Sequence, residues 1–256
     1  MRVLLIDHAE KVAEKIRISG GGRCNFTNLD TTPANFLSDN PRFCRSALAR
    51  FSPRDFMAML DRHHVSYHEK HKGQLFCDRS ADDIVQMLLA ECEAGGVTRW
   101  QPCRLEGLRY LSSHPHGQSA GSYEIDSNRG TIHCASVVVA TGGLSIPKIG
   151  STDLGYRIAQ QFDLPVIPTR PALVPLTFNE SQWQAFSLLS GLSLAATIET
   201  GAKKDKVAFH EDLLFTHRGL SGPGILQISS YWQPGTTLRI NLAPGLNLSS
   251  ELQTAK

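Results

Sequence analysis

The chain has 256 residues, a formal net charge of +2, 41% hydrophobic residues and 20% charged residues. This composition excludes an intrinsically disordered chain and allows one large domain or two small ones. Because the charge is nearly balanced and no Lys/Arg block stands out, we expect a small-molecule substrate rather than a nucleic-acid or membrane partner.

No targeting or membrane-spanning segment is expected from the sequence. The first apolar run, Val3 to Ile6, is closed at once by Asp7 and is far shorter than a signal-peptide core. The six cysteines are scattered, without a C-x-x-C pair or a framework spacing, so we expect reduced thiols. Together these features predict a cytoplasmic protein.

The first half of the chain predicts alternating strands and helices. Arg2 to Ile6 is a continuous aliphatic run that predicts a strand buried on both faces. Two helices are predicted over 52–63 and 80–94, since each begins with a capping serine and carries apolar residues at helical spacing. Ser80 and Asp83 have the spacing of a capping box. Residues 65–77, between the helices, predict a hairpin.

The second half predicts more strands and a change of domain. Three further strands are expected, over 103–111, 122–127 and 136–140. The Ser/His/Gly-rich stretch 112–122 predicts a loose hairpin tip, and 154–162 predicts a short helix. Four prolines between 165 and 175 suggest a linker. From Leu176 onward, strand-like segments separated by turns predict a β-rich domain.

A carboxylate, Asp7, directly follows the first predicted strand. In dinucleotide-binding folds a carboxylate at a strand end accepts hydrogen bonds from ribose hydroxyls. That interpretation requires a G-x-G-x-x-G turn on a preceding strand, and only Met1 stands before Arg2. The alternative is an ordinary solvated strand end.

Two glycine-rich segments have the character of ligand-binding loops. In Ser19 to Asn25, three consecutive glycines allow a backbone that wraps an anion, while Arg23 adds a fixed positive charge. The loop matches neither a Walker A motif nor a Rossmann fingerprint, and a flexible surface turn is the alternative. The segment Thr141-Gly142-Gly143 follows a predicted strand, where ligands of doubly wound folds bind. A plain strand-to-loop turn is the alternative there.

A group of four histidines raises the question of a metal site. The residues are His63, His64, His68 and His71. Residues 65–69 alternate like a strand, and no carboxylate or thiol with ligand spacing joins the group. Solvated histidines on a hairpin are therefore favoured over metal ligands.

A hydrolase pattern is also incomplete. Gly219 to Pro223, with His217 nearby, partly matches the nucleophile elbow G-x-S-x-G. Pro223 stands where the elbow needs a glycine, and we expect no strand-turn-helix context there. The sequence therefore does not favour a serine hydrolase.

Four blocks of the chain, taken together, resemble a known family. They are residues 1–28, 139–152 (VATGGLSIPKIGST), 170–176 (RPALVPL) and 214–224 (LFTHRGLSGPG). In this order they are similar to bacterial NAD(P)/FAD-dependent oxidoreductases of the BaiN/YhiN type, which include aminoacetone-oxidase-like flavoproteins. The loop SGGGRCN-x-TN followed by ATGG-x-S-x-P is the most specific part of the resemblance.

The resemblance implies an α/β fold, with a Rossmann-like FAD-binding domain of the two-dinucleotide-binding flavoprotein type and an inserted β-rich domain. We expect a partial FAD-binding domain over 1–172 and a partial inserted domain over 173–256. FAD is the implied cofactor and NAD(P)H a candidate electron donor. The implied FAD-binding residues are Asp7 at the adenosine ribose, Lys15, the loop Ser19, Gly20, Gly21, Gly22, Arg23, Cys24 and Asn25, and the turn Thr141, Gly142 and Gly143. No metal site and no catalytic side chain is implied.

The chain also departs from the family pattern. The family's first strand and G-x-G-x-x-G turn are expected before Arg2, and a closing glycine-rich segment is expected after the inserted domain, so the chain resembles a family member truncated at both ends. Ala13 stands where the family tends to have glycine. Two hypotheses follow: an FAD-dependent oxidoreductase acting on an unidentified small molecule, or an inactive fragment that binds FAD weakly or not at all. A nucleotide binder without flavin is a third, weaker interpretation.

Overall fold

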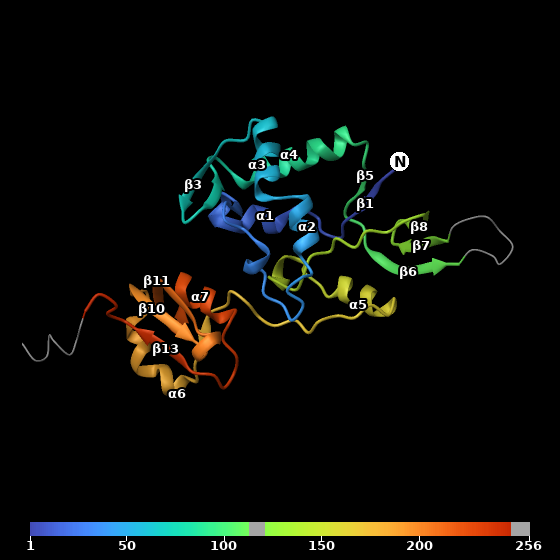
Figure 1. Cartoon of the computed structure of the whole chain (residues 1–256). Coiled ribbons are helices and arrows are strands. Elements are labelled where there is room, and N and C mark those ends of the chain that lie inside the picture. The colour runs from blue at the N-terminus through green and yellow to red at the C-terminus, as the bar shows by residue number, and fades with distance from the viewer. Residues whose placement is uncertain (113–120, 247–256) are drawn as a thin grey trace, which may run out of the picture. The chain divides into compact units, whose positions relative to one another are not determined.

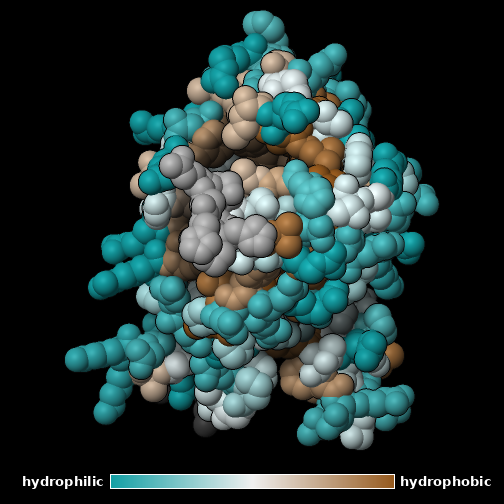
Figure 2. Space-filling model, turned by 90° about the vertical axis from the view of Figure 1, so that its right-hand side faces the viewer, coloured by the Kyte–Doolittle hydropathy of each residue, from teal (hydrophilic) through white to brown (hydrophobic). Residues whose placement is uncertain are grey.

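The computed structural model describes residues 1–112 and 121–246 and divides the chain into two compact units, residues 1–167 and 168–256 (Figure 1). Most of the predicted hairpin tip at 112–122 lies outside the described residues. None of the described helices is long and apolar enough to cross a bilayer. Hydrophobic side chains nevertheless reach the surface, as the brown areas among hydrophilic residues in Figure 2 show.

The first unit starts with a short parallel pair of strands. β1 (Leu4–Ile6) pairs with β5 (Thr98–Trp100), with Ile6 opposite Trp100. A strand is therefore present where the aliphatic run predicts one, but it is not buried on both faces, since Leu5 is 39% exposed. The reason is that the sheet has only these two strands in the described part of the chain, and one of its faces is not covered.

The core of the first unit lies between a three-stranded antiparallel sheet and two helices. The sheet contains β2 (Asn25–Asn28), β4 (Gln74–Cys77) and β3 (Tyr67–His71), in that order, and the helices are α3 (Pro53–Arg62) and α4 (Ala81–Ala94). Both predicted helices and the predicted hairpin are confirmed. Leu60 of α3, Cys77 of β4 and Ile84 of α4 meet in one buried cluster. This cluster fixes the glycine-rich loop, because Cys24 at the end of that loop belongs to it.

The two helices begin differently. At α3 the predicted start is a full capping box, in which the Ser52 hydroxyl accepts from the Asp55 backbone N–H and Asp55 accepts from the Ser52 N–H at 2.7 Å. At α4 the predicted Ser80/Asp83 box is wrong. The Ser80 hydroxyl accepts from the Asp82 N–H at 3.1 Å, while the Asp83 carboxylate instead pairs with Arg79.

A second antiparallel sheet of the first unit carries a smaller core. It consists of β6 (Leu105–Leu111), β7 (Ser122–Ser127) and β8 (Gly130–Cys134). Leu108 and Ile125 of this sheet pack against Ile158 of α5 (Leu154–Gln161), and Ile6 of β1 lies at the edge of the same cluster. The two predicted strands and the predicted helix are confirmed, and β8 is an additional strand.

The apolar run 136–140 is not a strand, which corrects the sequence prediction. No regular structure is assigned there, and Val138 is 87% exposed. A strand needs a neighbour to accept and donate its backbone hydrogen bonds, and no described strand pairs with this segment. Aliphatic composition alone therefore does not make this segment part of the sheet.

Short helices complete the first unit. They are α1 (Glu14–Ile18), α2 (Arg45–Arg50), and the 3₁₀ helices η1 (Ser19–Gly22), η2 (Pro33–Asn35) and η3 (Pro147–Ile149). The Arg17 guanidinium donates to the Asp82 carboxylate, which joins α1 to the first turn of α4. This contact sets the position of the loop that follows α1.

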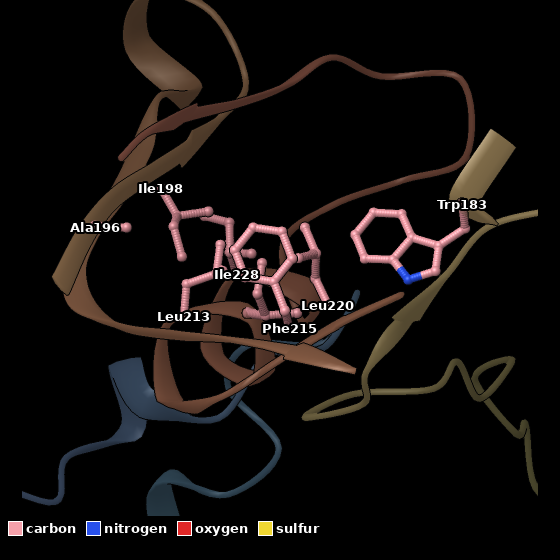
Figure 3. Close-up of a cluster of buried hydrophobic side chains, with 8 residues drawn as sticks. Trp183, Ala196, Ile198, Leu213, Phe215, Leu220 and Ile228 are labelled. Carbon is pink, nitrogen blue, oxygen red and sulfur yellow. The ribbon is translucent and has the colours of Figure 1, made fainter. Parts of the chain in front are cut away.

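The second unit is built on a five-stranded antiparallel sheet, as the sequence predicts for the region after Leu176. The strand order is β13 (Leu238–Asn241), β10 (Ser193–Thr200), β11 (Val207–Thr216), β12 (Gly219–Ser221) and β9 (Leu176–Thr177). The helices of this unit are α6 (Glu180–Trp183), η4 (Gln184–Leu189), η5 (Lys203–Asp205) and α7 (Pro223–Ser229). Ile198, Leu213 and Ile228 fill its core, which Figure 3 shows with Trp183 at one edge.

The expectation that 219–223 lacks a strand-turn-helix context is wrong. β12 ends at Ser221, Gly222 makes the turn, and α7 starts at Pro223. A Cβ atom on Gly222 would lie 2.8 Å from two backbone atoms of β11, so this glycine permits close packing of the turn. Pro223 still occupies the place of the elbow's last glycine, so the hydrolase motif remains incomplete.

The departure at Ala13 has a measurable consequence. Ala13 caps α1 with φ 60° and ψ 36°, the left-handed region that disfavours residues with a Cβ atom. We expect Ala13→Gly to raise the free energy of unfolding by about 0.5–1 kcal/mol, after the larger entropy of unfolded glycine is subtracted. Urea unfolding measures this. Ala58→Gly, inside α3, is the control and should lower stability by about 1 kcal/mol; equal losses in both variants would contradict the strain at Ala13.

Candidate cofactor-binding site

Asp7 lies at the carboxyl end of β1, where the sequence predicts a ribose-binding carboxylate. Its backbone N–H donates to the Trp100 carbonyl at 3.1 Å, which holds it against β5. One carboxylate oxygen accepts from the Ala9 N–H at 2.9 Å, and the side chain is 33% exposed. The carboxylate is thus oriented by its own backbone and remains accessible to a hydroxyl donor.

The glycine loop Ser19 to Asn25 follows α1 in a tight turn. Gly20, Gly21 and Gly22 have φ of 58°, 67° and 86°, and the Cys24 N–H donates to the Ser19 carbonyl at 3.0 Å. A Cβ atom on Gly20 would lie 2.7 Å from both the Asn25 nitrogen and the Phe76 ring, whereas Gly21 and Gly22 would meet nothing within 4 Å. Gly20 therefore serves packing, and the other two present bare backbone on an open side.

Cys24 and Arg23 have opposite surroundings within this loop. Cys24 is 4% exposed and belongs to the core cluster, and this burial raises the pKa of its thiol. Its neighbour Cys77 is also buried, and burial raises the pKa of that thiol to about 12. Both thiols are therefore protonated near neutral pH, which favours a packing role for Cys24 over a redox role. The side chain of Arg23 is exposed.

The turn Thr141-Gly142-Gly143 lies against α5. A Cβ atom on Gly155 of α5 would be 2.5 Å from the Thr141 hydroxyl, so the missing side chain allows helix and turn to approach closely. Gly142 has φ 70° and would meet nothing within 4 Å. The turn thus exposes backbone, as the sequence predicts, although the segment before it is not a strand.

Two long-range hydrogen bonds join the Asp7 region to the loop that follows this turn. His8 Nε2 lies 2.9 Å from the Gly150 carbonyl oxygen, and Lys15 Nζ donates to the Ser145 hydroxyl at 2.8 Å. Within the described residues, no hydrogen bond or ion pair links Thr141–Gly143 directly to Ser19–Asn25. The Lys15–Ser145 hydrogen bond instead joins α1, which precedes the glycine loop, to the residues that follow the Thr141–Gly143 turn.

A surface pocket of about 350 Å³ adjoins Asp7, and none of its lining residues was predicted as a site residue from the sequence. The lining residues are His8, Ala9, Glu10, Lys11, Glu14, Lys148, Ile149 and Gly150. Because Glu10 and Glu14 line it beside two lysines, it suits a neutral polar group better than a diphosphate. The only sequence signal for these residues is their position next to Asp7 and within the VATGGLSIPKIGST block.

The histidines of the 63–71 segment have separate carboxylate partners. His63 Nε2 lies 2.5 Å from Glu91, and His68 Nδ1 lies 2.7 Å from Asp78. Across residues 1–112 and 121–246, no group of three His, Cys, Asp or Glu side chains could hold a metal ion.

The residues at this site fit a dinucleotide. Asp7 would supply a carboxylate for ribose hydroxyls, Lys15 and Arg23 would supply positive charges for a diphosphate, and Gly21 and Gly22 leave space that a side chain would fill. The site combines a carboxylate at the end of a strand with a glycine loop whose backbone is exposed and which carries a positive charge at Arg23. That combination defines an α/β protein of the Rossmann, dinucleotide-binding class.

The chain belongs to the family described as HI0933-like protein Rossmann domain, whose match covers residues 1–247. The description of this family names a Rossmann domain, the fold of dinucleotide-binding proteins. The family and the α/β fold expected from the glycine-rich motifs are therefore confirmed.

The sequence of the chain is similar to those of three named relatives. It is 48% identical over 251 residues to the ribosomal RNA dihydrouridine synthase of Escherichia coli, covering 98% of this chain and 60% of the relative. It is 44% identical over 257 residues to the protein of the same name from Haemophilus influenzae, covering 99% and 61%. It is also 25% identical over 240 residues to the 3-dehydro-bile acid delta(4,6)-reductase of Clostridium scindens, covering 91% and 55%. The chain thus spans about 60% of the length of the two more similar relatives.

Proposed function

We propose that this protein reduces a uracil base of ribosomal RNA to dihydrouracil, using FAD as the cofactor and NAD(P)H as the electron donor. The observation that carries the proposal is the 48% identity, over 98% of the chain, to the Escherichia coli ribosomal RNA dihydrouridine synthase. The proposal replaces the expectation of a small-molecule substrate without nucleic acid, because that expectation depended on the net charge of the whole chain.

The site residues support an FAD-dependent reduction. Asp7 would hold the adenosine ribose, and Lys15 and Arg23 would neutralise the diphosphate. The Ser145 hydroxyl keeps Lys15 in place through its 2.8 Å hydrogen bond. When bound, FAD supplies the hydride chemistry that none of the amino-acid side chains can supply.

The overall reaction balances with the components named. Uridine, NAD(P)H and a proton give dihydrouridine and NAD(P)⁺. The 5,6 double bond of the base becomes a single bond by gaining one hydride and one proton. The name of the more distant relative, a delta(4,6)-reductase, also describes a reduction, so the names of both kinds of relative support a reductase.

The test combines cofactor binding with product analysis. The purified chain is titrated with FAD, then incubated with NADPH and ribosomal RNA transcribed in vitro, which carries no modified bases. We expect bound flavin absorbance and uridines heavier by two hydrogens in mass spectrometry of the digested RNA. Asp7→Asn keeps the backbone turn but removes the charge, and should weaken FAD binding on the order of tenfold. Asp30→Asn, in an exposed turn, is the control.

Two outcomes would contradict the proposal. Flavin binding and NADPH oxidation without any dihydrouridine would leave an FAD-dependent oxidoreductase with another substrate. A chain that binds no FAD and forms no product would favour the alternative of an inactive fragment.

A further inference from the structure

An exposed arginine cluster covers residues 42–54 of the first unit. Residues 40–54 contain four arginines and no Asp, Glu or Lys. We call Arg42, Arg45, Arg50, Arg54 and the neighbouring Phe43 the arginine surface. It has no part in the cofactor-binding site described above.

The local structure turns these arginines outward. The Arg45 N–H donates to the Arg42 carbonyl, and the Leu48 N–H donates to the Cys44 carbonyl, so residues 42–44 form a turn that leads into α2 (Figure 1). Cys44 and Leu48, one helical turn apart, are the half-buried side of the segment. Arg42, Arg45 and Arg50 lie on the exposed side, and Arg54 is exposed in the first turn of α3.

No described residue forms an ion pair with the arginine surface. In the described part of the chain none of its guanidinium groups forms an ion pair, whereas other arginines do: Arg17 pairs with Asp82, Arg79 with Asp83, Arg109 with Glu124 and Arg157 with Asp153. The adjacent Asp55 carboxylate is bonded to the backbone N–H and hydroxyl of Ser52, at 2.7 and 2.6 Å. The surface therefore presents four fixed positive charges to a partner.

An aromatic side chain stands among these charges. Phe43 is 83% exposed and has no aromatic neighbour among the described residues. The ring centroids of Phe51 and Phe56 are 6.2 Å apart, and Phe51 is still 49% exposed. Exposed aromatic rings next to arginines are typical of surfaces that bind single-stranded nucleic acid, where the rings stack on unpaired bases and the guanidinium groups contact phosphates.

We propose that the arginine surface binds the RNA substrate, with Arg42, Arg45, Arg50 and Arg54 on phosphates and Phe43 stacked on an unpaired base. This inference depends on the proposed function for its RNA, and adds where that RNA is held. The near-neutral net charge of the chain does not oppose it, because phosphates respond to the local cluster of charges rather than to the total.

The experiment compares two variants that lose equal charge. Arg42, Arg45 and Arg50 are replaced by alanine together. The control variant replaces three other exposed arginines of the same unit, Arg99, Arg104 and Arg129. Binding of in vitro transcribed ribosomal RNA is measured between about 50 and 200 mM salt. FAD binding and circular dichroism are recorded for both variants.

We expect the two arginine variants to differ in RNA binding. The Arg42/Arg45/Arg50 variant should bind RNA roughly 30-fold more weakly and reduce the salt slope of log K by about 2, while the control keeps an affinity within about threefold of the unchanged chain. Phe43→Ala should weaken RNA binding about tenfold and leave the salt slope unchanged. FAD binding should be equal in all of them, since none of these residues lies at the cofactor site.

The outcomes distinguish this inference from the proposed function. If the unchanged chain forms dihydrouridine and both arginine variants bind RNA equally well, the arginine surface is not the RNA site although the function stands. If the unchanged chain neither binds RNA nor forms dihydrouridine, the proposed function fails and this inference with it. Binding of anionic lipid vesicles, but not of RNA, through the same arginines would overturn the inference in favour of a membrane partner.

Discussion

Replacing Gly20 by alanine is expected to destabilise the first unit by about 3 kcal/mol and to abolish FAD binding. The backbone of Gly20 has φ 58°, which costs a residue with a Cβ atom about 1–2 kcal/mol. The added methyl group would also lie 2.7 Å from the Asn25 nitrogen and from the Phe76 ring. Relief of such overpacking typically costs a further 1–3 kcal/mol and would displace the loop.

Gly21→Ala is the matched control for this prediction. Its φ of 67° imposes similar backbone strain, but the new methyl group meets nothing within 4 Å. We expect a loss of only about 1 kcal/mol in the free energy of unfolding. If FAD approaches the bare side of the loop, Gly21→Ala should still weaken FAD binding about tenfold, because the methyl group occupies that side.

Urea unfolding and FAD titration of the two variants check both expectations. Equal stability losses in Gly20→Ala and Gly21→Ala would contradict the packing role of Gly20. If Gly21→Ala folds normally and its FAD affinity is unchanged, the open side of the loop does not contact the cofactor.

Ile198→Ala is expected to destabilise the second unit by about 3–4 kcal/mol. Ile198 lies in the middle of β10, is fully buried and packs in the cluster with Leu213 and Ile225. Removing its side chain loses both the transfer free energy and the contacts around the resulting cavity. Ile198→Val should cost only about 1 kcal/mol. Urea unfolding followed by Trp183 fluorescence measures the change, since Trp183 borders the same core.

A second substitution tests whether the packing around Ile198 is as close as the structure indicates. A Cβ atom on Gly224 of α7 would lie 2.5 Å from Ile198 Cδ1, the atom that valine lacks. The Ile198→Val/Gly224→Ala pair should therefore be more stable than the sum of the single changes predicts. Additive effects, or a small loss for Ile198→Ala, would show that this part of the sheet is loosely packed.

Much of the fold follows from signals within short stretches of sequence. Ser52 followed by Pro53 and Asp55 determines where α3 begins, because the cap and the helix it starts are within four residues. After Leu176, where strand-like segments predict a β-rich domain, residues 193–200 form one continuous strand opposite 207–214 of β11. The glycine-rich loop is also recognisable in sequence, because three consecutive glycines directly before an arginine are unusual.

Other features depend on contacts with residues that are distant in the sequence. The aliphatic run 136–140 has strand composition and no strand structure, since pairing depends on a neighbour. Among the three glycines of the loop, only the position of Phe76, on β4, shows that Gly20 is the packed one. The nearly balanced total charge of the chain does not reveal the arginine surface, because acidic residues outside residues 40–54 offset its charge in the sum.

The sequence by itself determined the glycine-rich loops, the strand-end carboxylate and the helix starts, since these depend on residues a few positions apart. Only the tertiary structure decided which of these residues meet. Lys15 and Ser145 are 130 positions apart, and His8 and Gly150 are 142 apart. Backbone conformation and capping are set by local interactions, whereas contacts over such separations depend on how the intervening chain folds.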